Sequence, residues 1–167
     1  MSHPYDTLRL ASGAALIFTP CPGTKNTSVE EAVSTLKAAG ANALITLMPA
    51  DELEKFEASA LPRLCADQGI TWFHLPVEDD HAPDERFAEA FGKQKASLMS
   101  LLEQRDTVAI HCRGGSGRTG FMAAILMLET GHDWDDVVCD VQGLRPGALK
   151  MPVHLDYLRE TYCCFPS

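Results

Sequence analysis

Four short hydrophobic runs recur along the chain, and polar or turn-forming positions follow each of them. Runs of this length bounded by turn residues are typical of strands. We expect strands at Ala14–Phe18, Ala43–Met48, Ile70–Val77 and Thr107–Cys112. Their nearly continuous hydrophobicity is typical of parallel strands that are buried on both faces of a sheet.

Hydrophobic residues at helical spacing occupy most of the remaining chain. Ser28 and Glu31 form a capping-box pattern, which predicts a helix that runs to Ala39. Pro83 is expected as the first residue of a long helix. Further helices are expected at Asp51–Gln68 (broken at Pro62), Gly117–Thr130, Asp133–Val141 and Pro152–Tyr162. Strands that alternate with helices predict an α/β fold, with a central mostly parallel sheet flanked by helices.

The chain has no repeat, low-complexity run or linker, so residues 1–167 are expected to form a single domain. Fourteen Lys and Arg residues against 23 Asp and Glu residues give a net charge of −9, which argues against nucleic-acid and acidic-membrane partners. The N-terminus lacks a secretory signal pattern, and the apolar run 122–128 is too short to span a bilayer. A cytoplasmic location is therefore expected, while the oligomeric state stays open.

The six cysteines are too irregularly spaced for a zinc site, and no metal is expected. Because cytosolic thiols stay reduced, a disulfide framework is not expected either. Cys65 and Cys139 are interpreted as small buried hydrophobic residues. The adjacent Cys163 and Cys164 are interpreted as packed tail residues, with a redox role toward Cys112 as the alternative.

The segment T-V-A-I-H-C-R-G-G-S-G-R-T-G, residues 107–120, combines a buried strand, a glycine-rich loop and the start of a helix. Successive backbone N–H groups and the helix dipole make such a loop a cradle for a phosphate. The same groups lower the pKa of a thiol, so Cys112 at the start of the loop is a candidate nucleophile. Arg118 supplies a planar fork for two phosphate oxygens. A Walker A loop is excluded because no Gly-Lys-Ser/Thr ends the run.

The run from His111 to Thr119 resembles the H-C-x5-R-T signature of the cysteine-dependent protein tyrosine phosphatases, and the small size resembles their dual-specificity branch. The resemblance implies that Cys112 forms a phosphocysteine and that Arg118 binds the phosphate and the transition state. It also implies that Thr119 assists departure of the thiolate, that His111 helps to set the thiol pKa, and that no cofactor is needed. The implied phosphate-binding residues are Arg113, Gly114, Gly115, Ser116, Gly117 and Arg118.

Cleavage of a phosphoester also needs an acid that protonates the leaving oxygen. Residues 75–84 leave a predicted strand and carry several carboxylates. The segment resembles the P-[IV]-x-D-x-x-x-P pattern of phosphatases similar to the kinase-associated phosphatase (the cyclin-dependent kinase inhibitor 3 group). This resemblance places the acid on Asp79, with Asp80 as the alternative.

The resemblance extends to the turn Leu144–Ala148, where Arg145 either supports the signature loop or caps a helix. The family often carries a Gln soon after this turn. Val153 and His154 stand near that position here, so a role for such a Gln in positioning water is in doubt.

These observations predict a phosphomonoester hydrolase that acts on phosphotyrosine in proteins, with phosphoserine and phosphothreonine left open. A phosphatase of phosphoinositides or other small phosphomonoesters is one alternative. A sulfurtransferase and a phosphate-binding module are alternatives of other classes. A sulfurtransferase would not need Asp79, and the presence of Cys112, Arg118 and Asp79 together argues against an inactive binding module.

Overall fold

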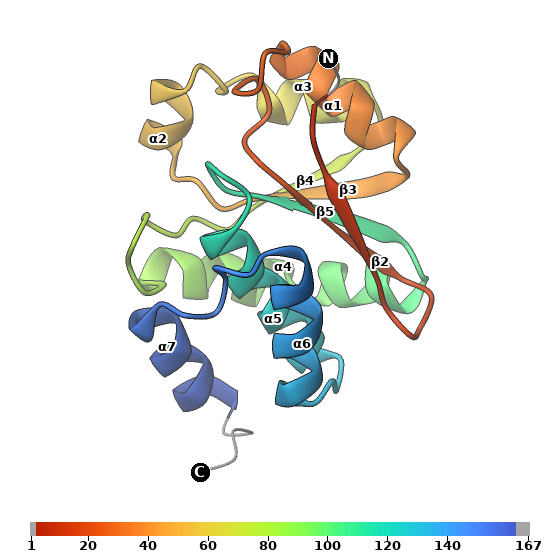
Figure 1. Cartoon of the computed structure of the whole chain (residues 1–167). Helices are drawn as coiled ribbons and strands as arrows, with labels where there is room; N and C mark the ends of the chain where they lie inside the picture. The colour runs from red at the N-terminus through yellow and green to blue at the C-terminus, as the bar shows by residue number, and fades with distance from the viewer. Residues whose placement is uncertain (1–2, 163–167) are drawn as a thin grey trace.

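A five-stranded sheet forms the centre of the structure, a computed structural model that describes residues 3–162 (Figure 1). The strands are β1 (Asp6–Arg9), β2 (Ala15–Thr19), β3 (Ala41–Thr46), β4 (Thr71–His74) and β5 (Thr107–His111). Their order is β1-β2-β5-β3-β4, and only the pairing of β1 with β2 is antiparallel among the described strands. The predicted α/β fold with a mostly parallel sheet is therefore confirmed.

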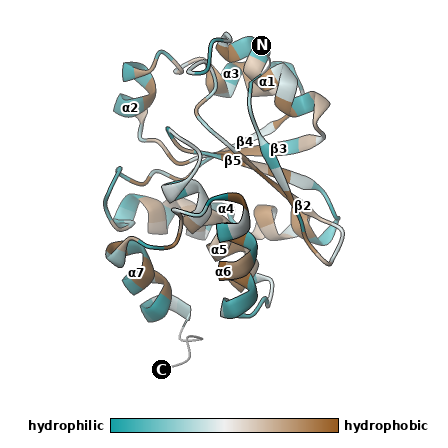
Figure 2. Ribbon diagram, in the orientation of Figure 1, coloured by the Kyte–Doolittle hydropathy of each residue, from teal (hydrophilic) through white to brown (hydrophobic). Residues whose placement is uncertain are grey.

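Helices cover both faces of the sheet (Figures 1 and 2). One face packs against α1 (Val29–Ala38), α2 (Ala50–Lys55) and α3 (Leu61–Asp67). The other packs against α4 (Glu85–Glu103), α5 (Gly117–Glu129), α6 (Trp134–Leu144) and α7 (Pro152–Tyr162). Alternate residues of β5 point into the two cores, Val108 and Ile110 into one and Ala109 into the other. Burial on both faces explains why the strands read as nearly continuous hydrophobic runs.

Several predicted boundaries were wrong. The break between α2 and α3 lies at residues 56–60, and Pro62 sits in the first turn of α3, where its missing N–H breaks no helical hydrogen bond. Helix α4 begins at Glu85 rather than at Pro83, because the carboxylate of Asp84 caps it by accepting from the N–H of Arg86 at 2.9 Å. Helix α6 continues three residues beyond Val141.

The strand predicted over Ile70–Val77 was too long, because β4 ends at His74. Strand β1 was not predicted. Three of its four residues are polar, so the strand at the edge of the sheet forms no hydrophobic run. The predicted cap at Ser28 is confirmed, since its hydroxyl oxygen accepts from the N–H of Glu31 at 3.0 Å.

Most of the described cysteines fit the role of buried hydrophobic residues. Burial raises the pKa of Cys65 to about 11 and that of Cys21 to about 12, the latter with help from nearby Glu52, so both thiols are protonated near neutral pH. Cys139 is exposed on α6, contrary to the prediction that it would be buried. Cys163 and Cys164 lie outside the described residues. Within residues 3–162, no helix is long and apolar enough to cross a membrane.

Candidate active site

The loop between β5 and α5 surrounds the sulfur of Cys112. This residue continues the face of β5 that packs against α5, and it is 4% exposed. Its Sγ accepts hydrogen bonds from the N–H of Gly115 at 3.3 Å and from the hydroxyl of Thr119 at 3.2 Å. A negative charge on the sulfur therefore meets two donors before any substrate binds.

Gly115 gives the loop its sharp turn. Its φ of 81° is unfavourable for residues with a side chain, and an added Cβ would lie 2.7 Å from the carbonyl carbon of Thr19. An added Cβ on Gly114 or Gly117 meets open space. The loop ends at Ser116, directly before α5, whose first residue is Gly117.

Arg145 stabilises the signature loop through a hydrogen bond to its backbone. Its Nε donates to the carbonyl of Gly115 at 2.8 Å, and a terminal nitrogen pairs with Asp6 at 2.7 Å. The residue also stands at the C-terminal end of α6. The two interpretations of Arg145 are therefore not exclusive, because its backbone ends the helix while its side chain supports the signature loop.

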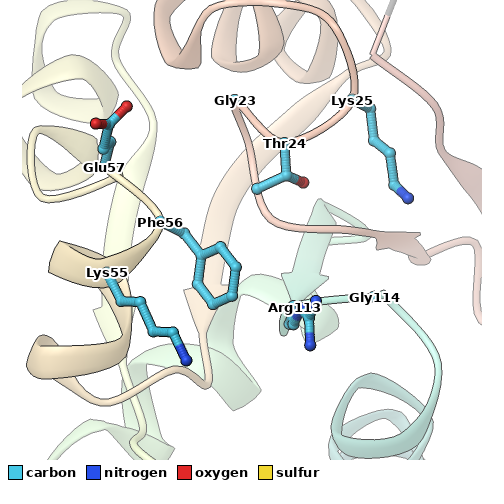
Figure 3. A pocket seen from close by; sticks show the side chains of 8 residues that line it. All are labelled: Gly23, Thr24, Lys25, Lys55, Phe56, Glu57, Arg113 and Gly114. Carbon is cyan, nitrogen blue, oxygen red and sulfur yellow. The ribbon is translucent and has the colours of Figure 1, made fainter.

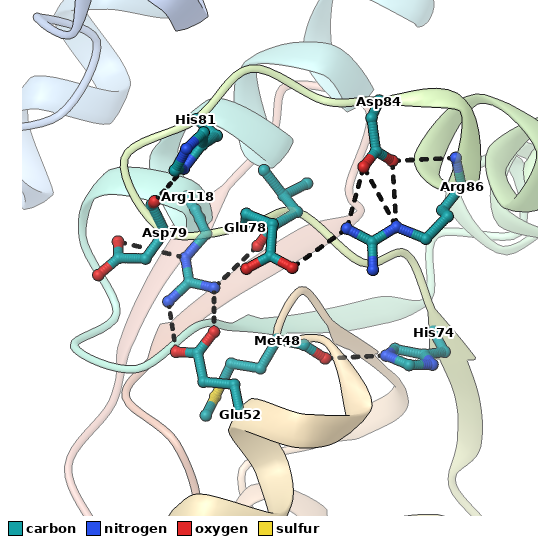
Figure 4. Close-up of polar contacts among 10 residues, drawn as sticks. Met48, Glu52, His74, Glu78, Asp79, His81, Asp84, Arg86 and Arg118 are labelled. Atoms are coloured by element: carbon teal, nitrogen blue, oxygen red, sulfur yellow. Dashed lines mark hydrogen bonds and ion pairs between the residues drawn. The ribbon is translucent and has the colours of Figure 1, made fainter.

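The guanidinium of Arg118 is held at the mouth of the loop by three groups (Figure 4). Its terminal nitrogens donate to both carboxylate oxygens of Glu52 at 2.8 Å, and one of them also donates to the carbonyl of Val77 at 2.9 Å. Its Nε lies 3.7 Å from a carboxylate oxygen of Asp79. Burial alone would lower the pKa of Arg118, but its hydrogen bonds to Glu52 and the charge of Cys112 outweigh burial and raise the pKa.

The role of Glu52 could not be predicted from the sequence. The side chain lies in the first turn of α2 and is only 16% exposed. Asp51 and Glu54 flank it with the same chemistry, so nothing in the local pattern distinguishes the buried carboxylate from its exposed neighbours. Its role depends on the tertiary approach of α2 to α5.

A tight turn at Glu78–His81 separates the two candidate acids. The N–H of His81 donates to the carbonyl of Glu78 at 3.2 Å, and Asp80 takes a positive φ of 61° at the third position of the turn. The carboxylate of Asp79 extends toward Arg118 (Figure 4). Among the described residues, Arg118 forms ion pairs with Glu52 and Asp79 and none with Asp80.

His154 of α7 contacts this turn through the backbone of His81. The side chain is buried, its ring stacks on Phe121 at 4.5 Å between centroids, and its Nε2 lies 3.1 Å from the carbonyl of His81. Because a carbonyl only accepts, Nε2 carries the proton. Burial lowers the pKa of His154, so the ring is neutral at neutral pH. His154 thus connects α7 to the segment that carries Asp79.

The ring of His111 is buried behind the loop and is neutral. Its Nδ1 donates to the carbonyl of Cys112 at 3.0 Å, so its Nε2 accepts from the hydroxyl of Thr46 at 2.8 Å. The indole N–H of Trp72 donates to the same hydroxyl oxygen at 2.8 Å. Burial lowers the pKa of His111 to about 4. The ring therefore acts on the loop by orienting the Cys112 carbonyl, without a positive charge.

The signature loop, the buried arginine and the parallel sheet together define the cysteine-dependent phosphatases of the dual-specificity type, and the comparisons with known proteins agree. A family model described as "Tc-R-P: Polymorphic toxin system, DSP-PTPase phosphatase" matches residues 21–132. This match covers more than half of the chain. The protein belongs to this family and is a cysteine-dependent phosphatase.

Two curated relatives show the same resemblance in sequence. The chain is 27% identical to the protein tyrosine phosphatase type IVA 3 of Bos taurus over 121 residues, which are 66% of this chain and 68% of that protein. It is 27% identical to the cyclin-dependent kinase inhibitor 3 of Rattus norvegicus over 138 residues, which are 80% of this chain and 63% of that protein.

Solved structures share the fold. The kinase associated phosphatase with its catalytic-site cysteine replaced by serine superposes with a TM-score of 0.80 at 22% identity, over 99% of each chain. PTPMT1 in complex with PI(5)P superposes with a TM-score of 0.69 at 14% identity, over 95% of this chain and 94% of that one.

Proposed function

We propose that the protein hydrolyses phosphotyrosine in proteins through a phosphocysteine at Cys112. The phosphate binds to the backbone N–H groups of residues 113–117 and to Arg118. The sulfur of Cys112 attacks phosphorus while the bond to the leaving oxygen breaks, and Asp79 gives that oxygen a proton. Asp79 then takes a proton from water, which attacks phosphorus and releases the thiolate of Cys112. The Thr119 hydroxyl stabilises this thiolate by the hydrogen bond that it already makes.

One observation carries this proposal: the buried sulfur of Cys112, the fixed fork of Arg118 and the carboxylate of Asp79 meet around one loop. Arg118 and the loop amides supply the charge stabilisation that phosphoryl transfer requires. The turn at Asp80 leaves Asp79 as the carboxylate that faces this centre, which favours Asp79 over Asp80 as the acid.

Glu52 and His111 have positioning roles in this scheme. Glu52 holds the fork of Arg118 through two hydrogen bonds, so that its remaining edge stays in place for phosphate oxygens. His111 orients the Cys112 carbonyl and so sets the direction of the loop. Neither group touches the reacting atoms.

The proposed substrate class rests on the relatives, which include a protein tyrosine phosphatase and the kinase associated phosphatase. Phosphoserine and phosphothreonine stay open, and the phosphoinositide named with PTPMT1 is the alternative substrate. The cytoplasmic location stays a prediction from the sequence.

Hydrolysis of p-nitrophenyl phosphate and of a phosphotyrosine peptide tests the proposal. The wild type is expected to turn over both substrates, and Cys112→Ser is expected to lose at least about 10⁴-fold in kcat while it still binds the peptide. Rapid acid quenching of the wild type should trap the phosphocysteine. Unchanged turnover by Cys112→Ser would exclude the mechanism, and thiosulfate:cyanide transfer by the wild type would indicate a sulfurtransferase instead.

A further inference from the structure

A hollow lies beside the signature loop, and Asp79 is not among the residues that line it. Its volume is about 600 Å³, and three segments line it: the loop before α1, the end of α2 and the start of the signature loop (Figure 3). This is far more space than one phosphate group needs. The mechanism proposed above makes no use of it.

Three cations line this hollow. Lys25, Lys55 and Arg113 are all exposed, and none of them forms an ion pair with a carboxylate within residues 3–162. The one carboxylate in the lining belongs to Glu57, and it points away from the ring of Phe56 (Figure 3). The lining therefore carries more positive than negative charge, although the whole chain has a net charge of −9.

Two of these cations contact the ring of Phe56. The guanidinium carbon of Arg113 lies 5.0 Å from the ring centroid, and Nζ of Lys55 lies 5.8 Å from it. A cation at this distance from an aromatic face is attracted to it, which limits the positions of both side chains. Phe56 thus gives the basic surface a fixed wall between α2 and the signature loop.

This wall also borders the cleft that is lined by Glu52 and Asp79. Lys55, Phe56 and Arg113 also line a smaller cleft of about 270 Å³, whose other lining residues are the carboxylates of Asp51, Glu52, Glu78 and Asp79. The two spaces therefore lie next to each other, with these three side chains between them. Charge is distributed unevenly around them, with carboxylates on the side of the acid loop and cations on the other side.

We propose that the basic hollow binds a second phosphate group, carried by a phosphopeptide a few residues from the phosphotyrosine that is hydrolysed. This inference rests on the proposed function, because it assumes that the first phosphate occupies the signature loop. A phosphorylated side chain carries close to two negative charges and three acceptor oxygens, which match the donors of Lys25, Lys55 and Arg113.

The uneven charge favours a linear peptide over a ring that carries phosphates on several sides. A peptide places its second phosphate in one direction, toward the cations. An inositol ring with phosphates on several sides would also direct negative charge toward Asp51 and Glu78. Like charges in such a narrow cleft repel.

A peptide series tests the subsite. Each peptide carries one phosphotyrosine and, at one position from −4 to +4, either serine or a non-hydrolysable phosphonate analogue of phosphoserine. Release of phosphate from the phosphotyrosine is measured. We expect the phosphonate to raise kcat/KM about tenfold on one side of the phosphotyrosine, an effect typical of a charge-assisted contact, and the gain to fall with added salt.

The variant Lys25→Gln/Lys55→Gln removes two of the cations and leaves the proposed catalytic groups in place. We expect it to lose the phosphonate gain while its turnover of p-nitrophenyl phosphate stays at the wild-type level. The matched control is Lys37→Gln/Lys93→Gln, which removes the same charge from exposed lysines of α1 and α4 that do not line the hollow. The control variant should keep the gain.

The outcomes separate the subsite from the proposed function. Wild-type hydrolysis of phosphotyrosine with no phosphonate gain at any position would overturn the subsite and leave the function intact. If both double variants lose the phosphonate gain equally, the gain depends on the net charge of the protein and not on the hollow. This result would also overturn the subsite. A lysine-dependent preference for inositol bisphosphate, with no preference among the peptides, would overturn the phosphopeptide as the ligand and indicate an inositol phosphate instead. Absence of any Cys112-dependent hydrolysis would contradict the function itself.

Discussion

Two arginines of the signature motif, five residues apart, have opposite environments: Arg113 lies in the loop, and Arg118 lies in the first turn of α5. Arg118 is 3% exposed and is bound by Glu52, the carbonyl of Val77 and Asp79. Arg113 is exposed and lies over the ring of Phe56. The buried arginine is already oriented when a substrate arrives, so little ordering is left for binding to supply. The exposed arginine packs on an aromatic face and stays open to solvent, which suits a group that meets the variable part of a substrate.

Within this comparison, the largest difference should appear when each arginine is replaced by lysine. Lysine keeps the charge and loses the planar fork that Glu52 and a phosphate share. We expect Arg118→Lys to lower kcat/KM for p-nitrophenyl phosphate by about 10³-fold, and Arg113→Lys by less than about tenfold. Equal losses in the two variants would contradict the distinction between the buried, bound arginine and the exposed one.

The two neighbouring aspartates should differ almost as much. Asp79→Asn removes the proposed proton donor, so kcat for a phosphotyrosine peptide should fall by about 10²- to 10³-fold. The loss should be smaller for p-nitrophenyl phosphate, whose leaving group needs less protonation. Asp80→Asn is the matched control, and a larger loss in that variant would move the acid to Asp80.

His111 is buried like Arg118, and its lowered pKa predicts how the stability of the protein depends on pH. Its folded pKa of about 4 lies below the ordinary value of 6.5, so the unfolded state binds the proton first. The contribution is complete above pH 6.5 and is lost as pH falls toward 4. The two pKa values give a total loss of about 3 kcal/mol, of which about 2 kcal/mol is lost by pH 5.

Urea unfolding at pH 7.5 and pH 5 measures this dependence. His3 and His154 also have pKa values lowered by burial, so they add to the slope of the wild type in the same direction. His111→Asn should be less sensitive to this pH change than the wild type. A pH dependence unchanged by His111→Asn would contradict the burial argument.

The fold could be predicted from the sequence where burial imposes a pattern. The hydrophobic runs predicted β2, β3 and β5, because both faces of these central strands are covered. Strand β1 has one neighbour and a polar sequence, so no pattern indicated it. The start of α4 depended on whether Pro83 is the first helical residue or Asp84 is the cap, a choice that the capping hydrogen bond decides.

The residues of the candidate site could also be predicted only in part from the sequence. The signature loop is contiguous, so Cys112 and Arg118 could be predicted from their spacing. Glu52 lies 66 residues from Arg118, and its role depends on the packing of α2. Lys25 and Lys55 come from two segments that meet only in the folded chain, so their shared hollow has no signature in the sequence.

The variant Glu52→Gln tests how Glu52 acts on the buried Arg118, because phosphate binding and kcat should change in opposite directions. In the free enzyme the carboxylate of Glu52 already neutralises Arg118, and a bound phosphate shares the guanidinium with it. Glu52→Gln removes that competition, so inorganic phosphate should inhibit the variant about threefold more tightly. The fork loses one of its two fixed bonds, so kcat should fall about tenfold.

The exposed Glu54 of the same helix supplies the control, since Glu54→Gln makes the same chemical change without contact with Arg118. A merely structural role for Glu52 would weaken phosphate inhibition and turnover together, as partial unfolding of α2 would do. A fall in kcat combined with tighter phosphate inhibition requires that Glu52 acts through the position and charge of Arg118. Separate measurement of kcat, KM and the inhibition constant for phosphate distinguishes these two cases.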